Sequence, residues 1–402
     1  MRGCRKVNSI TERLQSLFPD MVEWRRHLHR HPELSYGEQM TSAFVAGKLA
    51  EWGIEVRTGV GGYGVTGTVR GGRSRGPRLT AALRADMDAL PIQDGKSCDY
   101  ASTVPGVMHA CGHDAHTAAL LAVAKMFAEN KDELPGDVRF LFQPAEEISP
   151  GGAEPMIADG ALDGVDRVYG VHLWTPFPAG IVYSAPGPVM AAADEFVIHI
   201  RGKGGHGGLP HQTVDSILVG SHLVVNLQTI VSRSVDPTEP GVVSIGKFQA
   251  GNGFNVIAET CSINGTVRSF DDKVRETIVS RMERICAHTG EMFGADIQLD
   301  YKPGYPPVVN DKAETERFFR VAESLFGAEH VQASPLIMAG EDFSYYLQCV
   351  PGCFMFVGAG NPAAGIAAPH HHPMFDIDES AMLQSAQLLA SMAVSYLSGS
   401  SR

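Results

Sequence analysis

The sequence has few cysteines and no excess of basic residues. Its 402 residues include 7 cysteines, a small and odd number, which excludes a disulfide scaffold and favours a reducing compartment. Lys and Arg number 33 against 45 Asp and Glu, for a formal net charge of −12. Because the chain is acidic and has no basic stripe, we expect it to bind neither nucleic acid nor an anionic membrane surface.

Long apolar runs are also absent. No stretch of about 18 apolar residues occurs, so we expect no transmembrane helix. No apolar segment follows the basic start at residues 1–15, so we expect no secretory signal and a cytoplasmic protein. The apolar fraction of 44% is ordinary for a globular protein, and the length suits two domains or one domain with a large insertion.

Short apolar segments alternate with helical patterns in the first half of the chain. Asp20 and Glu23 fit a capping box at the start of a helix. The pattern then predicts an Ala/Leu-rich helix at 116–130 and strands at 65–69, 79–83, 138–142 and 168–173. This alternation predicts an α/β fold with a mixed or largely parallel sheet covered on both faces.

The order of elements changes near residue 188. From 195 to 301 the patterns follow the order β-α-β-β-α-β, which is the ferredoxin-like unit. We therefore expect a module at 188–301 to be inserted in a larger domain formed by 1–187 and 302–402. The larger domain is expected to resume after a Pro-rich turn at 302–307 and to end in a helix at 379–397.

Residues suited to metal binding or proton transfer fall at predicted strand ends or just beyond them: Asp88, Cys111, His113, Glu146, Glu147 and His172. The carboxyl ends of parallel strands meet at one edge of a sheet, so one site could collect them. With a tail histidine from 370–372 they could hold two metal ions that share a ligand, which suits hydrolysis. Each motif alone also has an ordinary interpretation: a capped turn, an inert buried cysteine, a solvated acidic pair or a core histidine.

Cys111 also allows a second catalytic mechanism, in which its thiol is the nucleophile. The helix that follows it would favour a thiolate through its N-terminal dipole, and a cysteine hydrolase built on this thiol is the chief alternative. His109 and His116 could be supporting or exposed residues. A Ser-His-Asp hydrolase is disfavoured because the sequence has no G-x-S-x-G motif.

Three further candidates lie in the predicted insertion. His206 lies in the glycine-rich segment 201–211, Asn255 follows the glycines at 251–253, and Arg268 ends a predicted strand. The glycine-rich segment lacks the GK[ST] of a phosphate-binding loop. Arg268 could hold a substrate carboxylate in a bidentate pair, but all three could equally be surface residues.

Seven segments, taken together and in order, resemble one family: RADMDALP, HACGHDAH, FQPAEE, GVHLW, GKGGHGGLPH, GEDF and HHPMFD. This is the metal-dependent amidohydrolase family of hippurate hydrolase, bacterial N-acyl-amino-acid amidohydrolases and plant auxin-conjugate hydrolases. The resemblance runs from about Trp24 to Phe375. It implies a metallo-exopeptidase-like α/β catalytic domain with a mixed central sheet, and a ferredoxin-like lid that also forms dimers.

The resemblance also implies roles for individual residues. The implied metal ligands are His113, Glu147, His172, His371 and Cys111, whose thiolate would bridge the ions; His370 and His372 are the alternatives to His371. Glu146 is implied as the general acid/base, and Asp88 as the acid that orients a ligand imidazole. His206 is implied to stabilise the oxyanion, and Asn255 and Arg268 to contact the substrate. The motif Glu341-Asp342 is shared with the family, but no role follows for it.

The sequence therefore predicts an enzyme that hydrolyses the amide bond of N-acyl amino acids to a carboxylate and a free amino acid. It would use two divalent metal ions per subunit, with Zn, Mn, Co and Ni all compatible with the mixed ligands, and we expect a homodimer. The same site could instead act on a dipeptide, an N-carbamoyl amino acid or N-acetyl-diaminopimelate. A non-catalytic metal- or ligand-binding relative is the remaining alternative.

Overall fold

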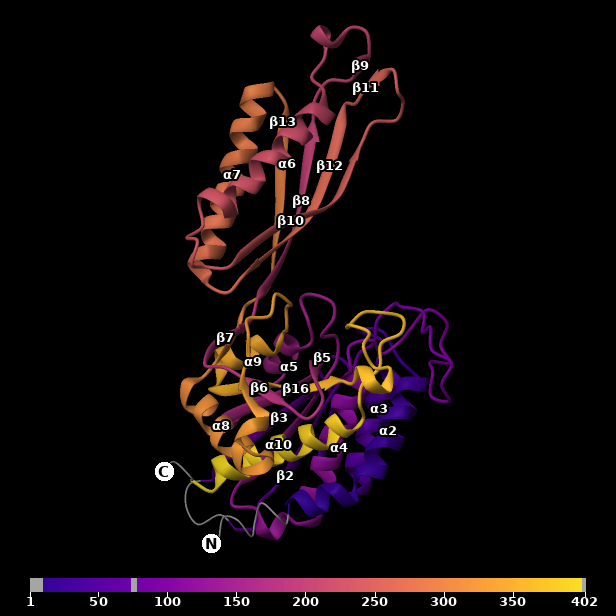
Figure 1. Cartoon of the computed structure of the whole chain (residues 1–402), viewed down its shortest axis with the longest axis vertical. Coiled ribbons are helices and arrows are strands. Elements are labelled where there is room, and N and C mark those ends of the chain that lie inside the picture. Colours follow the sequence, from indigo (N-terminus) through magenta and orange to yellow (C-terminus); the bar gives the residue numbers. More distant parts are fainter. Residues whose placement is uncertain (1–9, 74–77, 400–402) are drawn as a thin grey trace. The chain divides into compact units, whose positions relative to one another are not determined.

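The computed structural model describes residues 10–73 and 78–399 (Figure 1). The chain forms two compact units. The first consists of the described residues up to Gly187, of Val309–Pro335 and of the described residues from Asp342 on. The second consists of Pro188–Val308 and Leu336–Glu341. Among the described helices, none is both long and apolar enough to cross a bilayer.

An eight-stranded mixed sheet forms the centre of the first unit. Its strands, in spatial order, are β1 (Glu55–Val60), β2 (Gly64–Val69), β4 (Asp137–Gln143), β3 (Thr80–Asp86), β5 (Arg167–Pro178), β16 (Gly352–Gly360), β6 (Val182–Ser184) and β15 (Val331–Ala333). The inner strands β4, β3, β5 and β16 run parallel. Every residue of β3 and β16 is buried, as expected for strands covered on both faces. The parallel centre brings several strand ends to one edge of the sheet.

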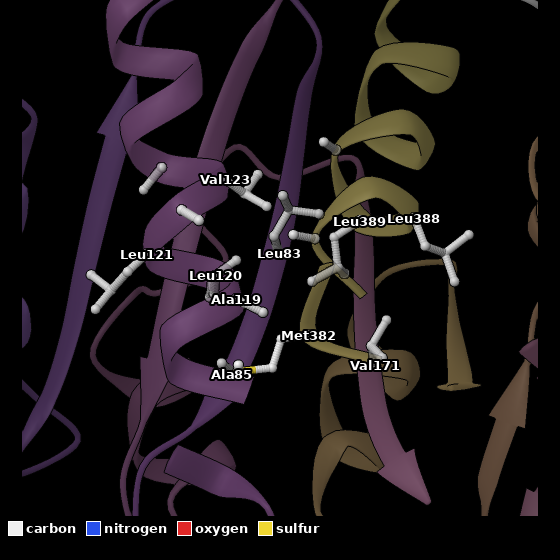
Figure 2. Packing of buried hydrophobic residues seen from close by; sticks show 14 of the residues in the cluster. Leu83, Ala85, Ala119, Leu120, Leu121, Val123, Val171, Met382, Leu388 and Leu389 are labelled. Atoms are coloured by element: carbon white, nitrogen blue, oxygen red, sulfur yellow. The ribbon is translucent and has the colours of Figure 1, made fainter. Parts of the chain in front are cut away.

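Helices pack on this sheet or on the helices that cover it: α2 (Phe18–Arg30), α3 (Gln39–Glu51), α4 (His113–Glu129), α5 (Ala153–Ala158), α8 (Lys312–Phe326), α9 (Phe343–Cys349) and α10 (Ser380–Leu397). The Ala-rich helix α4 is buried along almost its whole length, because its small side chains allow neighbouring elements to approach closely. Figure 2 shows Leu83 of β3 between Val123 of α4 and Leu389 of α10. This packing fixes the start of α4 beside the ends of β3 and β5.

Two expectations about helix starts were wrong. Helix α4 begins at His113 rather than at 116, directly after Gly112, whose φ of 91° is easily adopted only by glycine. Helix α2 begins at Phe18 with Pro19 in its first positions, where proline is well tolerated. Asp20 therefore lies inside the first turn, and the expected capping box does not form.

The second unit has the ferredoxin-like order. Its four-stranded sheet runs β10 (Gly241–Ala250), β12 (Thr260–Ser269), β8 (Ala192–Arg201) and β13 (Asp296–Tyr305). Helices α6 (Ser216–Arg233) and α7 (Asp272–Phe293) lie side by side on one face of this sheet (Figure 1). Asp215 and Asp271 cap the two helices by accepting hydrogen bonds from backbone amides of their first turns.

We expected a Pro-rich turn at 302–307, and the first half of this expectation was wrong. Strand β13 continues to Tyr305, with a shift in register against β8 between Lys302 and Tyr305. The carboxylate of Asp194 accepts hydrogen bonds from the Gly304 amide at 2.8 Å and from Arg275 Nε at 2.7 Å. These contacts hold the irregular segment in the strand despite its proline and glycine.

Candidate metal centre

Ligand-type side chains meet where β3, β4 and β5 approach the first turn of α4. Five groups of described residues have their ligand atoms within 4.8 Å of one another, and three of them lie around Cys111 and His113: Cys111, His113 and His172; Cys111, Glu147 and His371; and His113, Glu146 and Glu147. The first two groups share Cys111, and the third shares His113 with the first and Glu147 with the second. One continuous cluster of this kind has enough donors for two ions with a shared ligand.

His172 reaches the cluster from within a strand rather than from its end. The strand expected at 168–173 continues to Pro178, but β3 pairs with β5 only as far as Arg84 and Gly170. His172 thus lies just beyond this pairing, at the edge where β3 stops. Its Nδ1 is 2.8 Å from the carbonyl oxygen of Leu173, and its Nε2 is 3.6 Å from Cys111 Sγ.

His113 is oriented by Asp88. Its Nδ1 lies 3.0 Å from the Asp88 carbonyl oxygen and 3.1 Å from Asp88 Oδ1, which places the ring proton on Nδ1 and leaves Nε2 free to bind a metal. The other oxygen of Asp88 accepts hydrogen bonds from the Glu147 amide at 3.0 Å and from Ser35 Oγ at 2.7 Å. Burial opposes ionisation of Asp88, but these hydrogen bonds and the His113 charge outweigh it and lower its pKa.

The charge of the cluster favours a cation. Burial lowers the pKa of His113, but the neighbouring carboxylates of Asp86, Asp88 and Glu147 outweigh it and raise that pKa to about 10. Burial and the carboxylates of Glu147 and Glu146 raise the pKa of the Cys111 thiol well above its ordinary value. Burial and these carboxylates thus oppose the thiolate that the helix dipole was expected to favour at Cys111. A thiolate here needs a positive partner such as a metal ion.

Two buried atoms in the cluster have no hydrogen-bond partner among the described residues. They are His113 Nε2 and Glu147 Oε1, which lie 3.8 Å apart. Buried polar atoms are rarely left unpaired, and imidazole nitrogen, carboxylate oxygen and cysteine sulfur are the donors that transition metals bind. A divalent ion would satisfy both atoms, so the residues present fit a metal centre.

The three tail histidines have different surroundings. His371 has a positive φ of 62°, unusual for a residue other than glycine, and its Nε2 is 3.4 Å from Glu147 Oε2. The His370 ring lies 5.3 Å from the His172 ring, and its Nε2 accepts a hydrogen bond from the Thr175 amide at 3.3 Å. Nδ1 of His372 accepts one from the Met374 amide at 3.0 Å. The geometry therefore favours His371 as the tail ligand.

The glutamate pair lies in the turn that follows β4. Ala145, which precedes the pair, has a positive φ of 54°. The buried Glu146 lies in the same group as His113 and Glu147. One glutamate beside the ligands could move protons while its neighbour binds metal.

Asp342 has a structural role that the sequence did not reveal. Its carboxylate accepts hydrogen bonds from Arg84 Nη2 at 2.9 Å, from Gln143 Nε2 at 2.7 and 2.8 Å, and from the Ala153 amide at 3.0 Å. It thus ties the ends of β3 and β4 to the start of α5. Burial raises the pKa of Asp342 to about 6 despite the charge of Arg84. Glu341 is buried and belongs to the second unit.

The sequence also did not predict the buried contact between His116 and Asp86. His116 Nδ1 is 2.7 Å from Asp86 Oδ1, and His116 Nε2 accepts a hydrogen bond from the Leu173 amide at 2.9 Å. His116 is therefore a supporting residue that holds the backbone next to His172. His109 is buried as well, and neither ring nitrogen has a partner among the described residues. The signal in the sequence was the i, i+3 spacing of His113 and His116 on a helix, which places them on one face.

The remaining candidates belong to the second unit. His206 and Asn255 lie at a two-stranded antiparallel sheet, in which β9 (Gly205–His206) pairs with β11 (Val256–Ile257) and the Gly207 amide donates to the Asn255 carbonyl at 2.8 Å. His206 is exposed. Arg268, on β12, binds Thr266 Oγ1 and donates to the Val267 carbonyl at 3.0 Å. Their roles toward a substrate stay predictions.

Comparison with known proteins gives consistent matches. The model of Peptidase family M20/M25/M40 matches residues 82–395. The N-acyl-L-amino acid amidohydrolase of Geobacillus stearothermophilus is 49% identical over 72% of this chain and 78% of that protein. The N-acetyl-L-cysteine deacetylase of Bacillus subtilis is 42% identical over 96% of this chain and 90% of that protein.

A solved structure agrees with the sequence matches. The Bacillus subtilis YXEP protein, described as a dinuclear metal-binding peptidase from the M20 family, has a TM-score of 0.82 and 33% sequence identity. The match covers 96% of this chain and 99% of that one. The fold predicted from the sequence is thereby confirmed.

Proposed function

The chain belongs to Peptidase family M20/M25/M40 and hydrolyses amide bonds, and we propose that it does so with two divalent metal ions held around Cys111. The observation that carries the proposal is a pair of ligand groups that share the Cys111 sulfur. The unpartnered buried atoms His113 Nε2 and Glu147 Oε1 add to it. N-acyl amino acids are the substrate class, by similarity to the amidohydrolase and the deacetylase.

The residues that would hold the ions are His113, His172, Glu147, His371 and Cys111, whose sulfur belongs to two of the ligand groups and would bridge the ions. When bound, two ions at such a site lower the pKa of a water molecule and polarise the acyl carbonyl. Asp88 orients His113 through Nδ1 and holds the Glu147 backbone through its other oxygen. Asp88 is therefore a positioning residue, since it acts on the substrate only through these neighbours.

Glu146 is the proposed general acid/base. Its carboxylate takes a proton from the attacking water, whose oxygen forms the new bond to the acyl carbon. It then gives that proton to the leaving nitrogen as the amide C–N bond breaks, which releases a carboxylate and an amine. Its position beside His113 and Glu147 supports this role.

Residues of the second unit complete the proposal. His206 would donate to the oxyanion, and Asn255 and Arg268 would contact the substrate, Arg268 as partner of its carboxylate. Burial lowers the pKa of Arg268, but a guanidinium keeps its charge at neutral pH. Pairing of two chains through this unit is part of the proposal, and light scattering of the purified protein tests it.

The first experiment measures hydrolysis of hippurate and N-acetyl-methionine before and after dialysis against a chelator, with add-back of Zn, Mn, Co or Ni. We expect activity to be lost and then restored, and the add-back to identify the metals that support turnover. Activity that survives verified metal removal would refute the two-metal mechanism and favour the Cys111 nucleophile. Dipeptides, N-carbamoyl amino acids and N-acetyl-diaminopimelate belong in the same panel.

A variant of Glu146 tests the proton transfer. Glu146→Gln should keep its bound metal and lower kcat by about 10²- to 10⁴-fold, since a positioned acid/base contributes that much. Glu133→Gln is the matched control, because the Glu133 side chain is 64% exposed and pairs only loosely with Arg13 at 3.5 Å. Near-full activity in the metal-loaded Glu146 variant would refute the assignment.

A further inference from the structure

A short segment before α3, residues 33–38, contacts the backbone on both sides of the glutamate pair. Tyr36 Oη donates a hydrogen bond to the Ile148 carbonyl at 3.0 Å. Glu38 Oε1 accepts one from the Ala145 amide at 2.8 Å. Ala145 immediately precedes Glu146, and Ile148 immediately follows Glu147. The two contacts therefore enclose the pair along the chain.

Other contacts fix the segment itself. Ser35 Oγ donates to Asp88 Oδ2 at 2.7 Å, the Ala89 amide donates to the Glu33 carbonyl at 2.8 Å, and the Tyr36 amide donates to Glu38 Oε1 at 3.1 Å. The 33–38 segment is thus attached to the loop after β3 as well as to the turn after β4. It connects two loops that carry candidate site residues.

Backbone conformation points to the same place. Tyr36 and Ala145 have positive φ angles of 63° and 54°. Side-chain-bearing residues adopt such angles at a cost, and the angles persist only where surrounding contacts hold them. Glu38 supplies a contact to each of the two, because its Oε1 accepts from both amides.

Glu38 is costly to bury. Its side chain is fully buried, and its Oε2 has no hydrogen-bond partner within the described part of the chain. Burial raises the pKa of this carboxyl to about 7. Burying a carboxyl with an unpaired oxygen costs folding free energy. The contacts of the paired oxygen, Oε1, give a reason for Glu38 to be buried here. That oxygen holds the turn that carries Glu146.

We propose that the 33–38 segment, through Glu38 and Tyr36, is a positioning element for the general base of this enzyme. Glu38 fixes the Ala145 amide and Tyr36 fixes the Ile148 carbonyl, so that the backbone of Glu146 is held on both sides. Displacement of a catalytic group by about 1 Å can lower the rate about 10²-fold. The inference rests on the proposed role of Glu146.

The test compares Glu38→Ala, Glu38→Gln and Tyr36→Phe with wild type. Glu51→Ala is the control for Glu38, because Glu51 is the last residue of helix α3, which begins directly after Glu38, and its side chain is 63% exposed. Tyr63→Phe is the control for Tyr36, because Tyr63 is a half-exposed tyrosine in the turn between β1 and β2. For each protein, kcat, KM, bound metal and amide hydrogen exchange of residues 143–149 are measured.

We expect Glu38→Ala to lower kcat by about tenfold to a hundredfold, with KM and bound metal unchanged and faster exchange at 143–149. Glu38→Gln keeps an oxygen for both amides, so it should stay within about fivefold of wild-type kcat and keep the slow exchange. Tyr36→Phe should lower kcat about threefold to tenfold. Both controls should match wild type.

Any of these results would overturn the proposal: wild-type kcat in Glu38→Ala, unchanged exchange at 143–149, or loss of bound metal in parallel with kcat. An equal loss in Glu38→Gln and Glu38→Ala would also overturn it, because the retained oxygen would then be irrelevant. If wild type hydrolyses no acyl amino acid, the proposed function fails. The exchange measurement alone then decides whether the 33–38 segment holds the turn.

Discussion

Replacing Asp88 by asparagine tests how the candidate centre is organised. Asp88 accepts hydrogen bonds on both oxygens: from His113 Nδ1 on Oδ1, and from the Glu147 amide and Ser35 Oγ on Oδ2. Asparagine has a single acceptor oxygen and an NH₂ group that only donates. In either amide orientation, the NH₂ group therefore faces a donor.

The size of the effect follows from this mismatch. A buried donor left unpaired costs about 1–3 kcal/mol, which corresponds to about fivefold to 150-fold in an equilibrium constant. If the NH₂ group faces His113, the ring can accept its hydrogen bond only by moving its proton to Nε2, the atom proposed to bind metal. The Asp88 carbonyl oxygen, 3.0 Å from His113 Nδ1, opposes that change and limits the loss.

We therefore expect Asp88→Asn to bind metal about tenfold to a hundredfold more weakly than wild type, as supporting carboxylates of metal-binding histidines generally do when replaced. The assay is competition with a chromophoric chelator of known affinity. Asp137→Asn is the control, because Asp137 is equally buried but lies at the opposite end of β4, where Arg78 Nε binds it at 2.8 Å. Unchanged metal affinity in Asp88→Asn would refute the reasoning.

Three further outcomes are expected. His371→Ala should weaken metal binding at least about tenfold, whereas His370→Ala should lower stability with little effect on metal; equal effects in the chelator assay would reject the assignment of the tail ligand. Gly265→Ala should destabilise the second unit by at least about 1–3 kcal/mol, because the added Cβ would lie 2.2 Å from the Phe196 ring; calorimetry showing no change would contradict this packing. Burial, together with the nearby Asp88 charge, raises the pKa of Glu38 from its unfolded value of 4.5 to about 7, so ionisation favours unfolding and stability should fall as pH rises from about 4.5 to 7. Glu38→Gln should remove this fall, worth up to about 3 kcal/mol, in urea unfolding at pH 5 and pH 8.

The candidate site shows which residues can be found from sequence. Glu147 and His172 could be selected because each is a ligand type placed at or near the end of a predicted strand, and parallel strands collect their ends at one edge. Cys111 could be selected because it lies beside His113, just before a predicted helix. Arg84 and Asp342 could not be paired in this way, since 258 residues separate them along the chain. Their hydrogen bond exists only because helix α9 begins beside the ends of β3 and β4.

The chemical type of a residue also did not predict its role in the site. His370, His371 and His372 are identical in the sequence, and only the positive φ of His371 and the contacts of its two neighbours distinguish them. The sequence suggested a reactive thiolate at Cys111, but burial beside carboxylates raises its pKa instead. Solvation and neighbouring charge are properties of the folded chain, so a local helix dipole was an insufficient guide.

The sequence by itself determined the α/β class, the β-α-β-β-α-β order of the second unit and the family, because hydrophobic periodicity and local motifs are properties of short segments. Only the tertiary structure decided the partners of Asp88, the position of the 33–38 segment and the burial of Glu38. Those depend on contacts between residues far apart in the chain, such as Glu38 and Ala145, 107 positions apart. No local pattern encodes a contact of that kind, since it forms only when the whole core packs.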